Sequence, residues 1–159
     1  SRATRRGKAV AENADLIKLY SGRILALAAA IPHQGRLAAP MASVRRRAPL
    51  CGSTVTVDLD LVDGRVSRFA QEVRACALGQ AAAAVTGAAV IGATPAALAA
   101  ARDALRAMLA GDGPVPSAPF EEFAVLLPAR EFRNRHASIL LAIEAAAEAA
   151  EQASAAACA

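Results

Sequence analysis

Two cysteines and one histidine are the residues of this chain best suited to chemistry. Cys51 is followed by Gly52 and directly precedes the clearest strand pattern of the chain, so we expect it on the loop that feeds a sheet. Cys76 enters a helical stretch, where the positive end of the helix dipole favours a thiolate. His136 opens the last helical stretch in the same way. Two thiols and one imidazole form a donor set suited to zinc or to an iron–sulfur cluster.

Each of these residues carries little weight by itself. A lone buried cysteine is more often a small apolar side chain than a ligand, and a lone histidine is usually structural. The third cysteine, Cys158, lies roughly 33 Å beyond His136 along a continuous helix that rises about 1.5 Å per residue. We therefore leave Cys158 out of the site.

The elements that must position these residues begin with a hairpin. Thr54 to Leu61 alternates strictly between apolar and polar side chains, which predicts a half-buried antiparallel strand. Asp63-Gly64 is a hairpin turn signal, and Arg65 to Val73 returns as the partner strand. We expect Val55, Val57 and Leu59 of the first strand to face a core. The helices around Leu98, Leu105 and Leu140 make this core.

Helices surround this hairpin in the sequence. Thr94-Pro95 combines an N-cap with proline at the first helical position, and Gly111 stops that helix. Helices are expected over residues 9–30, 77–91, 95–110 and from about 136 towards 157. Pro32, Gly35 and Pro40 break the first helix, so we expect a loop that runs to the arginines at 45–47. The order predicts an α+β fold, a small antiparallel β-sheet packed against several helices.

Composition limits the classes of function. The chain is 55% hydrophobic, but with four Phe, one Tyr and no Trp its core must rely on Leu, Val and Ile with close alanine contacts. The net charge of +4 comes from basic clusters without interleaved aromatic residues, so we expect no nucleic-acid partner. The exposed basic loop at 45–47 could instead dock an acidic partner surface. Glycine and proline interrupt the longest weakly polar stretch, 75–101, so no membrane span is expected.

The chain suits one domain of ordinary size. We expect a basic N-terminal tail over residues 1–12, a single folded domain over 13–152 and an alanine-rich C-terminal tail over 153–159. Three scattered cysteines do not form a disulfide framework, which favours a reducing compartment. A cytoplasmic location is expected; the mitochondrial matrix is the alternative, because residues 1–8 are basic and acid-free, as in the remnant of a transit peptide or a tag.

Three segments resemble a known family, the U-type iron–sulfur cluster assembly scaffolds (the NifU N-terminal domain, IscU and SufU). Leu50-Cys51-Gly52-Ser53 before the alternating strand is similar to the family's Cys-Gly-Asp and strand. The run from Ala75 to Ala81 resembles the second cysteine entering an Ala/Ser-rich helix, and His136 to Leu140 resembles its His-Cys-Ser-Ile-Leu segment. Tyr20 and the loop from Pro32 to Gly35 are similar to the family's opening. The resemblance covers about residues 19–152 and implies a SufU/IscU-like fold.

The chain departs from this family at two positions. Members use three cysteines, with an aspartate two residues after the first. Here the aspartate position is Ser53 and the third cysteine position is Ala137. The resemblance therefore leaves Cys51, Cys76 and His136 as the ligand set for an iron–sulfur cluster or zinc.

The resemblance leaves two functions open. The first is an iron–sulfur cluster assembly scaffold or carrier that binds a labile cluster or metal and receives sulfur from a cysteine desulfurase. The alternative is a degenerate scaffold fold that acts as a structural or adaptor subunit for another protein partner, without metal. Neither is an enzyme in the strict sense. A zinc enzyme with an open Cys/Cys/His site is disfavoured because no general base is evident.

Overall fold

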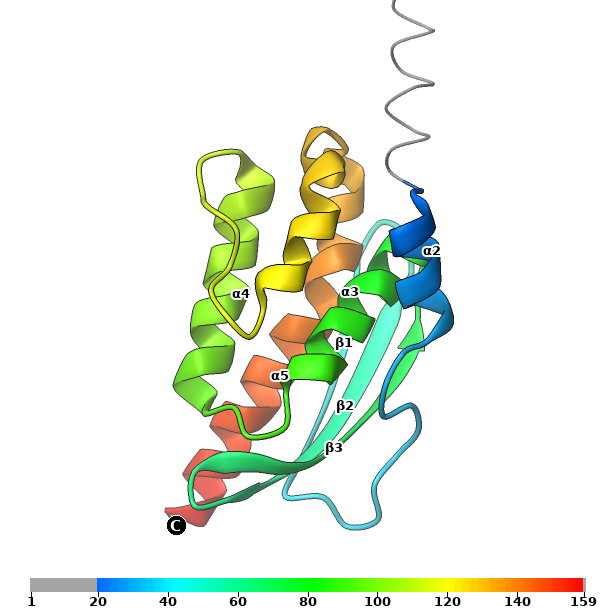
Figure 1. Cartoon of the computed structure of the whole chain (residues 1–159). Coiled ribbons are helices and arrows are strands. Elements are labelled where there is room, and N and C mark those ends of the chain that lie inside the picture. Colours follow the sequence, from blue (N-terminus) through cyan, green and yellow to red (C-terminus); the bar gives the residue numbers. More distant parts are fainter. Residues whose placement is uncertain (1–19, 159) are drawn as a thin grey trace, which may run out of the picture.

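The computed structural model describes residues 20–158, so the predicted basic tail over residues 1–12 lies outside it. Within that range a three-stranded sheet is followed by helices (Figure 1). The elements in chain order are α2 (Gly22–Ala29), β1 (Ala42–Arg47), β2 (Thr54–Val62), β3 (Arg65–Arg74), α3 (Ala77–Ala89), α4 (Pro95–Ala110), the 3₁₀ segments η1 (Glu121–Glu131) and η2 (Arg133–Arg135), and α5 (His136–Ala157). The α+β class predicted from the sequence is confirmed.

The sheet is antiparallel throughout, with strand order β1-β2-β3. The predicted hairpin is present: β2 and β3 are joined at Asp63 and Gly64, whose φ angles of 53° and 73° are the paired positive values that a tight hairpin turn needs. The loop expected around the arginines at 45–47 is wrong, because these residues form the end of strand β1. β1 has only two buried apolar side chains, Ala42 and Val44. It becomes a strand because it pairs with β2, and its sequence alone shows no clear alternation.

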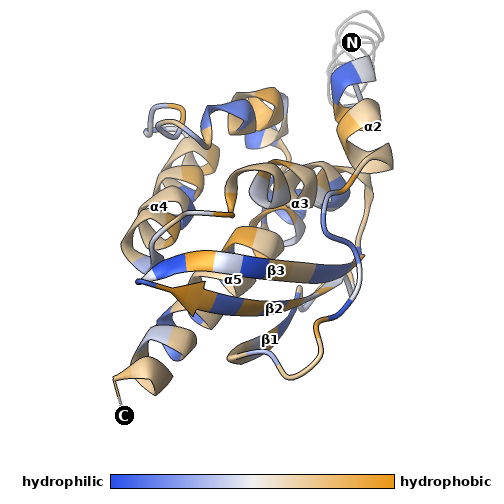
Figure 2. Ribbon diagram, turned by 60° about the horizontal axis from the view of Figure 1, so that its bottom comes forward, coloured by the Kyte–Doolittle hydropathy of each residue, from blue (hydrophilic) through white to orange (hydrophobic). Residues whose placement is uncertain are grey.

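Helices cover one side of the sheet (Figures 1 and 2). α5 packs across β1 and β2, α3 packs on β3, and α4 lies against α5. The strand residues Val55, Val57 and Leu59 are fully buried under these helices, as expected. Leu98 and Leu105 are also fully buried, but their helix α4 forms an outer layer on α5. Leu98 and Leu105 nevertheless belong to the same core as the strand residues, and Leu140 packs against that core, as expected.

Alanine and glycine let the helices approach each other closely. α3 buries the four consecutive alanines from Ala81 to Ala84, and α5 buries alanines along most of its length. A Cβ atom added at Gly79 of α3 would lie 2.6 Å from Ser138 Oγ of α5 and 2.8 Å from Ala75 Cβ. Glycine at this position therefore brings the start of α3 against the start of α5.

The caps expected for α4 are present. The Thr94 hydroxyl accepts a hydrogen bond from the Ala97 N–H at 3.1 Å, and Pro95 is the first helical residue. Gly111 ends the helix with a φ of 108°. None of the helices within residues 20–158 combines the length and the apolar character needed to cross a bilayer.

One buried glutamine fixes the loop between α2 and β1. The backbone of Gln71 in β3 donates to the His33 carbonyl and accepts from the Gly35 N–H, both at 2.9 Å. Its side-chain amide donates to the carbonyls of Pro32 and Ala83 at 3.1 and 3.0 Å. We call this arrangement the Gln71 clamp. It ties the loop both to the free edge of β3 and to helix α3.

Candidate functional site

Cys51 lies exposed on the short connection between β1 and β2. Two backbone hydrogen bonds close this loop: Ala48 N–H donates to the Ser53 carbonyl at 2.9 Å, and Gly52 N–H donates to the Ala48 carbonyl at 3.1 Å. Gly52 has a φ of 72°, a conformation that glycine adopts without strain. The loop therefore presents the Cys51 thiol at the end of the sheet, as predicted.

Cys76 is the N-cap residue of α3 and is half-buried. Burial raises the pKa of its thiol, but interactions with the Gly79 N–H, the Ser138 hydroxyl and the Leu78 N–H, together with the positive charge of Arg135, leave the pKa below its ordinary value. This is the direction expected for a thiol at a helix N-terminus.

Two buried serines connect the two cysteines. Cys51 Sγ lies 3.2 Å from Ser53 Oγ, the Ser138 hydroxyl donates to Ser53 Oγ at 3.1 Å, and Cys76 Sγ lies 3.6 Å from Ser138 Oγ. Hydrogen bonds with the hydroxyl and backbone of Ser53 lower the pKa of the Cys51 thiol. We call these four residues the cysteine–serine site. It has contributions from a loop, α3 and α5.

Ser138 is the member of this site that sequence reasoning missed. It lies two residues after His136, on the first turn of α5, and is 2% exposed. Its burial between helices could have been suggested by Gly79, which leaves room at the facing helix start.

His136 begins α5, but its ring is engaged elsewhere. Nε2 lies 2.9 Å from the carbonyl oxygen of Ala129 in η1, so this nitrogen donates its N–H there. Within residues 20–158, no three His, Cys, Asp or Glu side chains are grouped so that they could hold a metal ion. The structure thus connects Cys51 and Cys76 but does not bring His136 into a three-residue cluster with them. Metal or cluster ligation by this set stays a prediction.

The two positions that depart from the resembling family have different surroundings. Ser53 is 6% exposed and hydrogen-bonded within the site, whereas Ala137 is exposed on the first turn of α5. Cys158 lies exposed at the opposite end of α5.

Comparison with known proteins gives matches only among solved structures. No protein-family model matches the chain, and no curated protein does either. The N-terminal part of a nitrogen-fixing NifU-like protein from Brucella abortus is 44% identical, with a TM-score of 0.86 over 89% of this chain and 98% of that chain. A hypothetical protein is 23% identical, with a TM-score of 0.74 over 84% and 97%. A protein described as an iron–sulfur cluster assembly scaffold for the SUF system, from Fervidobacterium islandicum, is 19% identical, with a TM-score of 0.74 over 83% and 96%.

The last two matches show the fold alone, which is that of the NifU- and SufU-type scaffold proteins. The identity to the Brucella protein over nearly its whole length goes further. The chain belongs to the family of NifU-like N-terminal domains.

Proposed function

We propose that this protein is an iron–sulfur cluster assembly scaffold or carrier, whose cargo is a labile cluster or a metal ion held at Cys51 and Cys76. The observation that carries the proposal is the cysteine–serine site, where two thiols of lowered pKa are connected through Ser53 and Ser138. A thiol of lowered pKa supplies more thiolate at neutral pH, and thiolate is the form that binds iron and zinc.

His136 is the proposed third ligand. Because its Nε2 N–H donates to the Ala129 carbonyl, the neutral ring keeps Nδ1 as its unprotonated nitrogen. Metal-binding histidines commonly donate their other nitrogen to a carbonyl or carboxylate in this way. Among the described residues these three side chains are not grouped, so joint ligation of one metal ion would require a change in their positions.

The remaining coordination positions need a donor from outside the chain. Ser53 offers a neutral hydroxyl and Ala137 offers no donor, so the protein supplies fewer ligands than the family it belongs to. A small thiol or a cysteine of a partner protein fits the open positions. We therefore expect the cargo to be bound weakly and to be easily passed on.

A cysteine desulfurase is the proposed sulfur donor. The thiolate of Cys51 or Cys76 would attack the outer sulfur of the partner's persulfide, breaking that S–S bond and forming a new one. The partner's cysteine leaves as a thiolate. Cys51 is the better acceptor because it is exposed, whereas Cys76 is half-buried.

The second candidate is an adaptor subunit that keeps the fold for protein contact and binds no metal. It is favoured by the incomplete ligand set at Ser53 and Ala137. In that case the same buried serines would be a structural link between the Cys51 loop and α5.

Metal analysis after anaerobic reconstitution separates the two candidates. We expect iron and sulfide, or zinc, in the unaltered protein, and a loss of most of it in both Cys51→Ser and Cys76→Ser. Cys158→Ser is the matched control and should change nothing, because Cys158 is exposed at the far end of α5. If the unaltered protein binds neither iron nor zinc, the adaptor is the better description.

A second variant tests whether the missing ligand limits binding. Ala137→Cys adds a soft thiolate at an exposed position, so the fold should accept it, and we expect the iron retained per chain to rise severalfold. Ser53→Asp places a carboxylate in a buried position, so its folding must be checked by circular dichroism. A colourless Ala137→Cys/Ser53→Asp protein with an intact fold would contradict a metal site at this position.

A further inference from the structure

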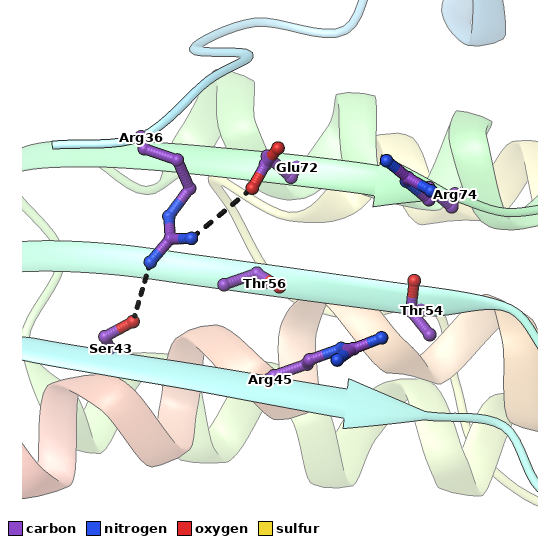
Figure 3. A pocket seen from close by; sticks show the side chains of 7 residues that line it. All are labelled: Arg36, Ser43, Arg45, Thr54, Thr56, Glu72 and Arg74. Carbon is purple, nitrogen blue, oxygen red and sulfur yellow. Dashed lines mark hydrogen bonds and ion pairs between the residues drawn. The ribbon is translucent and has the colours of Figure 1, made fainter.

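The side of the sheet that faces away from the helices carries a cationic hollow. It has a volume of about 490 Å³ and is lined by polar and charged side chains from all three strands and the preceding loop (Figure 3). Among the described residues, no apolar or aromatic side chain lines it. A ligand of this hollow is therefore recognised through charge and hydrogen bonds.

The sheet register places arginines on both sides of two threonines. Arg45 of β1 lies opposite Thr56 of β2, and Arg74 of β3 lies opposite Thr54. Residues directly opposite each other share one face of a sheet. In Figure 3, Arg45 extends along the sheet towards Thr54 of β2. Arg74 lies at the end of β3, on the other side of β2. Two guanidinium groups and two hydroxyls thus surround one part of the hollow.

In the other part of the hollow, the positive charge of Arg36 is balanced by the carboxylates of Asp58 and Glu72. Arg36 donates from Nε to Asp58 Oδ2 at 2.7 Å and from Nη2 to Asp58 Oδ1 at 3.2 Å, and its Nη1 lies 3.5 Å from Glu72 Oε1. Its Nη2 also donates to Ser43 Oγ at 3.3 Å. Arg36 therefore holds both carboxylates at its own end.

Arg45 and Arg74 differ from Arg36 in their surroundings. Neither makes an ion pair with any residue between 20 and 158, and both are exposed. These two positive charges lie on the two strands that flank β2 and repel each other, and an anion between them would relieve this repulsion.

We propose that this hollow binds a small molecule through a phosphate group. One guanidinium group can donate two parallel N–H hydrogen bonds to the oxygens of a phosphate or a carboxylate. Two guanidinium groups together with two hydroxyls offer more donors than the two oxygens of one carboxylate can use, whereas a phosphate or pyrophosphate has enough oxygens. Cys51 and Cys76 take no part in this binding, so the proposal is independent of cluster or metal binding.

Isothermal titration of the metal-free protein with pyrophosphate at low ionic strength tests the proposal. We expect saturable binding at one site per chain. Arg45→Gln and Arg74→Gln should each weaken it at least tenfold, and the double variant should abolish it. Arg102→Gln is the matched control: it removes the same charge from α4, where Arg102 pairs with Asp103, and should leave the affinity unchanged.

Three results would overturn the proposal. Equal weakening in all arginine variants would mean that net charge alone attracts the anion. Citrate binding as tightly as pyrophosphate would mean that the hollow recognises carboxylates. Saturable binding of an oligoglutamate peptide without saturable binding of pyrophosphate would mean that this face contacts an acidic protein. Iron retention in Arg45→Gln and Arg74→Gln, measured separately, should equal that of the unaltered protein.

Discussion

The two faces of strand β2 show how one alternating pattern serves two purposes. On the inner face, Val55, Val57 and Leu59 are fully buried beneath α5. On the outer face, Thr54 and Thr56 are partly exposed, while Asp58 is fully buried by the loop that follows α2. The inner face stabilises the fold through apolar burial, and the outer face leaves hydroxyls and charges available for ligands. We therefore expect inner substitutions to reduce stability and outer ones to alter binding.

The largest expected effect is on the inner face. Leu59→Ala removes a fully buried side chain and should lower the free energy of unfolding by about 2–5 kcal/mol. Thr56→Ala, three residues earlier on the outer face, is the control and should change it by no more than about 0.5 kcal/mol. Urea unfolding followed by circular dichroism measures both. Similar losses in the two variants would contradict the division between the faces.

An intermediate effect is expected at Asp58, the buried carboxylate of the outer face. Burial raises its pKa, but hydrogen bonds from Arg36, Ser43 Oγ–H and the Leu37 N–H, with the charge of Arg36, bring it below its ordinary value of 3.8. A carboxyl with a lowered folded-state pKa binds fewer protons in the folded protein. Its contribution to stability is therefore present above about pH 4 and is lost as the pH falls through the folded pKa.

Asp58→Asn tests this reasoning. The free energy of unfolding of the variant should be lower by about 1–3 kcal/mol at pH 7, because Arg36, Ser43 and the Leu37 N–H lose their charged acceptor. The unaltered protein should lose stability relative to the variant as the pH falls below 4. Asp63→Asn in the hairpin turn removes the same charge from an exposed position and is the control. A constant difference between Asp58→Asn and the unaltered protein from pH 7 to pH 2 would contradict the lowered pKa.

The smallest effect concerns two neighbouring arginines of β1. Arg46 pairs with Glu144 and Glu148 of α5 at 3.3 Å, whereas Arg45 points to the outer face. Because these pairs are partly exposed, Arg46→Gln should lower stability by no more than about 1 kcal/mol. Arg45→Gln should not lower it at all, because it relieves repulsion with Arg74. Thermal unfolding at low and high salt measures both, and a larger loss for Arg45→Gln would contradict the assignment of the faces.

The sequence predicts some parts of this molecule better than others, for physical reasons. β2, β3 and α4 have their own local signals: strict alternation, a turn at Asp63-Gly64, and Thr94, Pro95 and Gly111 at the helix ends. β1 has no such local signal, because three successive arginines interrupt the alternation that begins with Ala42 and Val44. It becomes a strand through its pairing with β2.

The candidate site was also predictable only where local sequence signals exist. The placement of Cys51 on a loop and of Cys76 at a helix start follows from flanking sequence. The serine link between them depends on α5 packing at the start of α3, which no local pattern records. The bond from His136 to Ala129 depends on η1, a 3₁₀ segment with no clear periodicity in the sequence.

The Gln71 clamp affects how molecules of this protein can associate through the edges of their sheets. A free sheet edge is a template on which another molecule can add a strand, and this is a common route to aggregation. The clamp occupies part of the β3 edge, where the loop at Gln34 already forms a bridge with Gln71. The other edge is β1, whose six residues include three consecutive arginines. Antiparallel addition of a second β1 would gather like charges, so each edge carries its own protection against strand exchange between molecules.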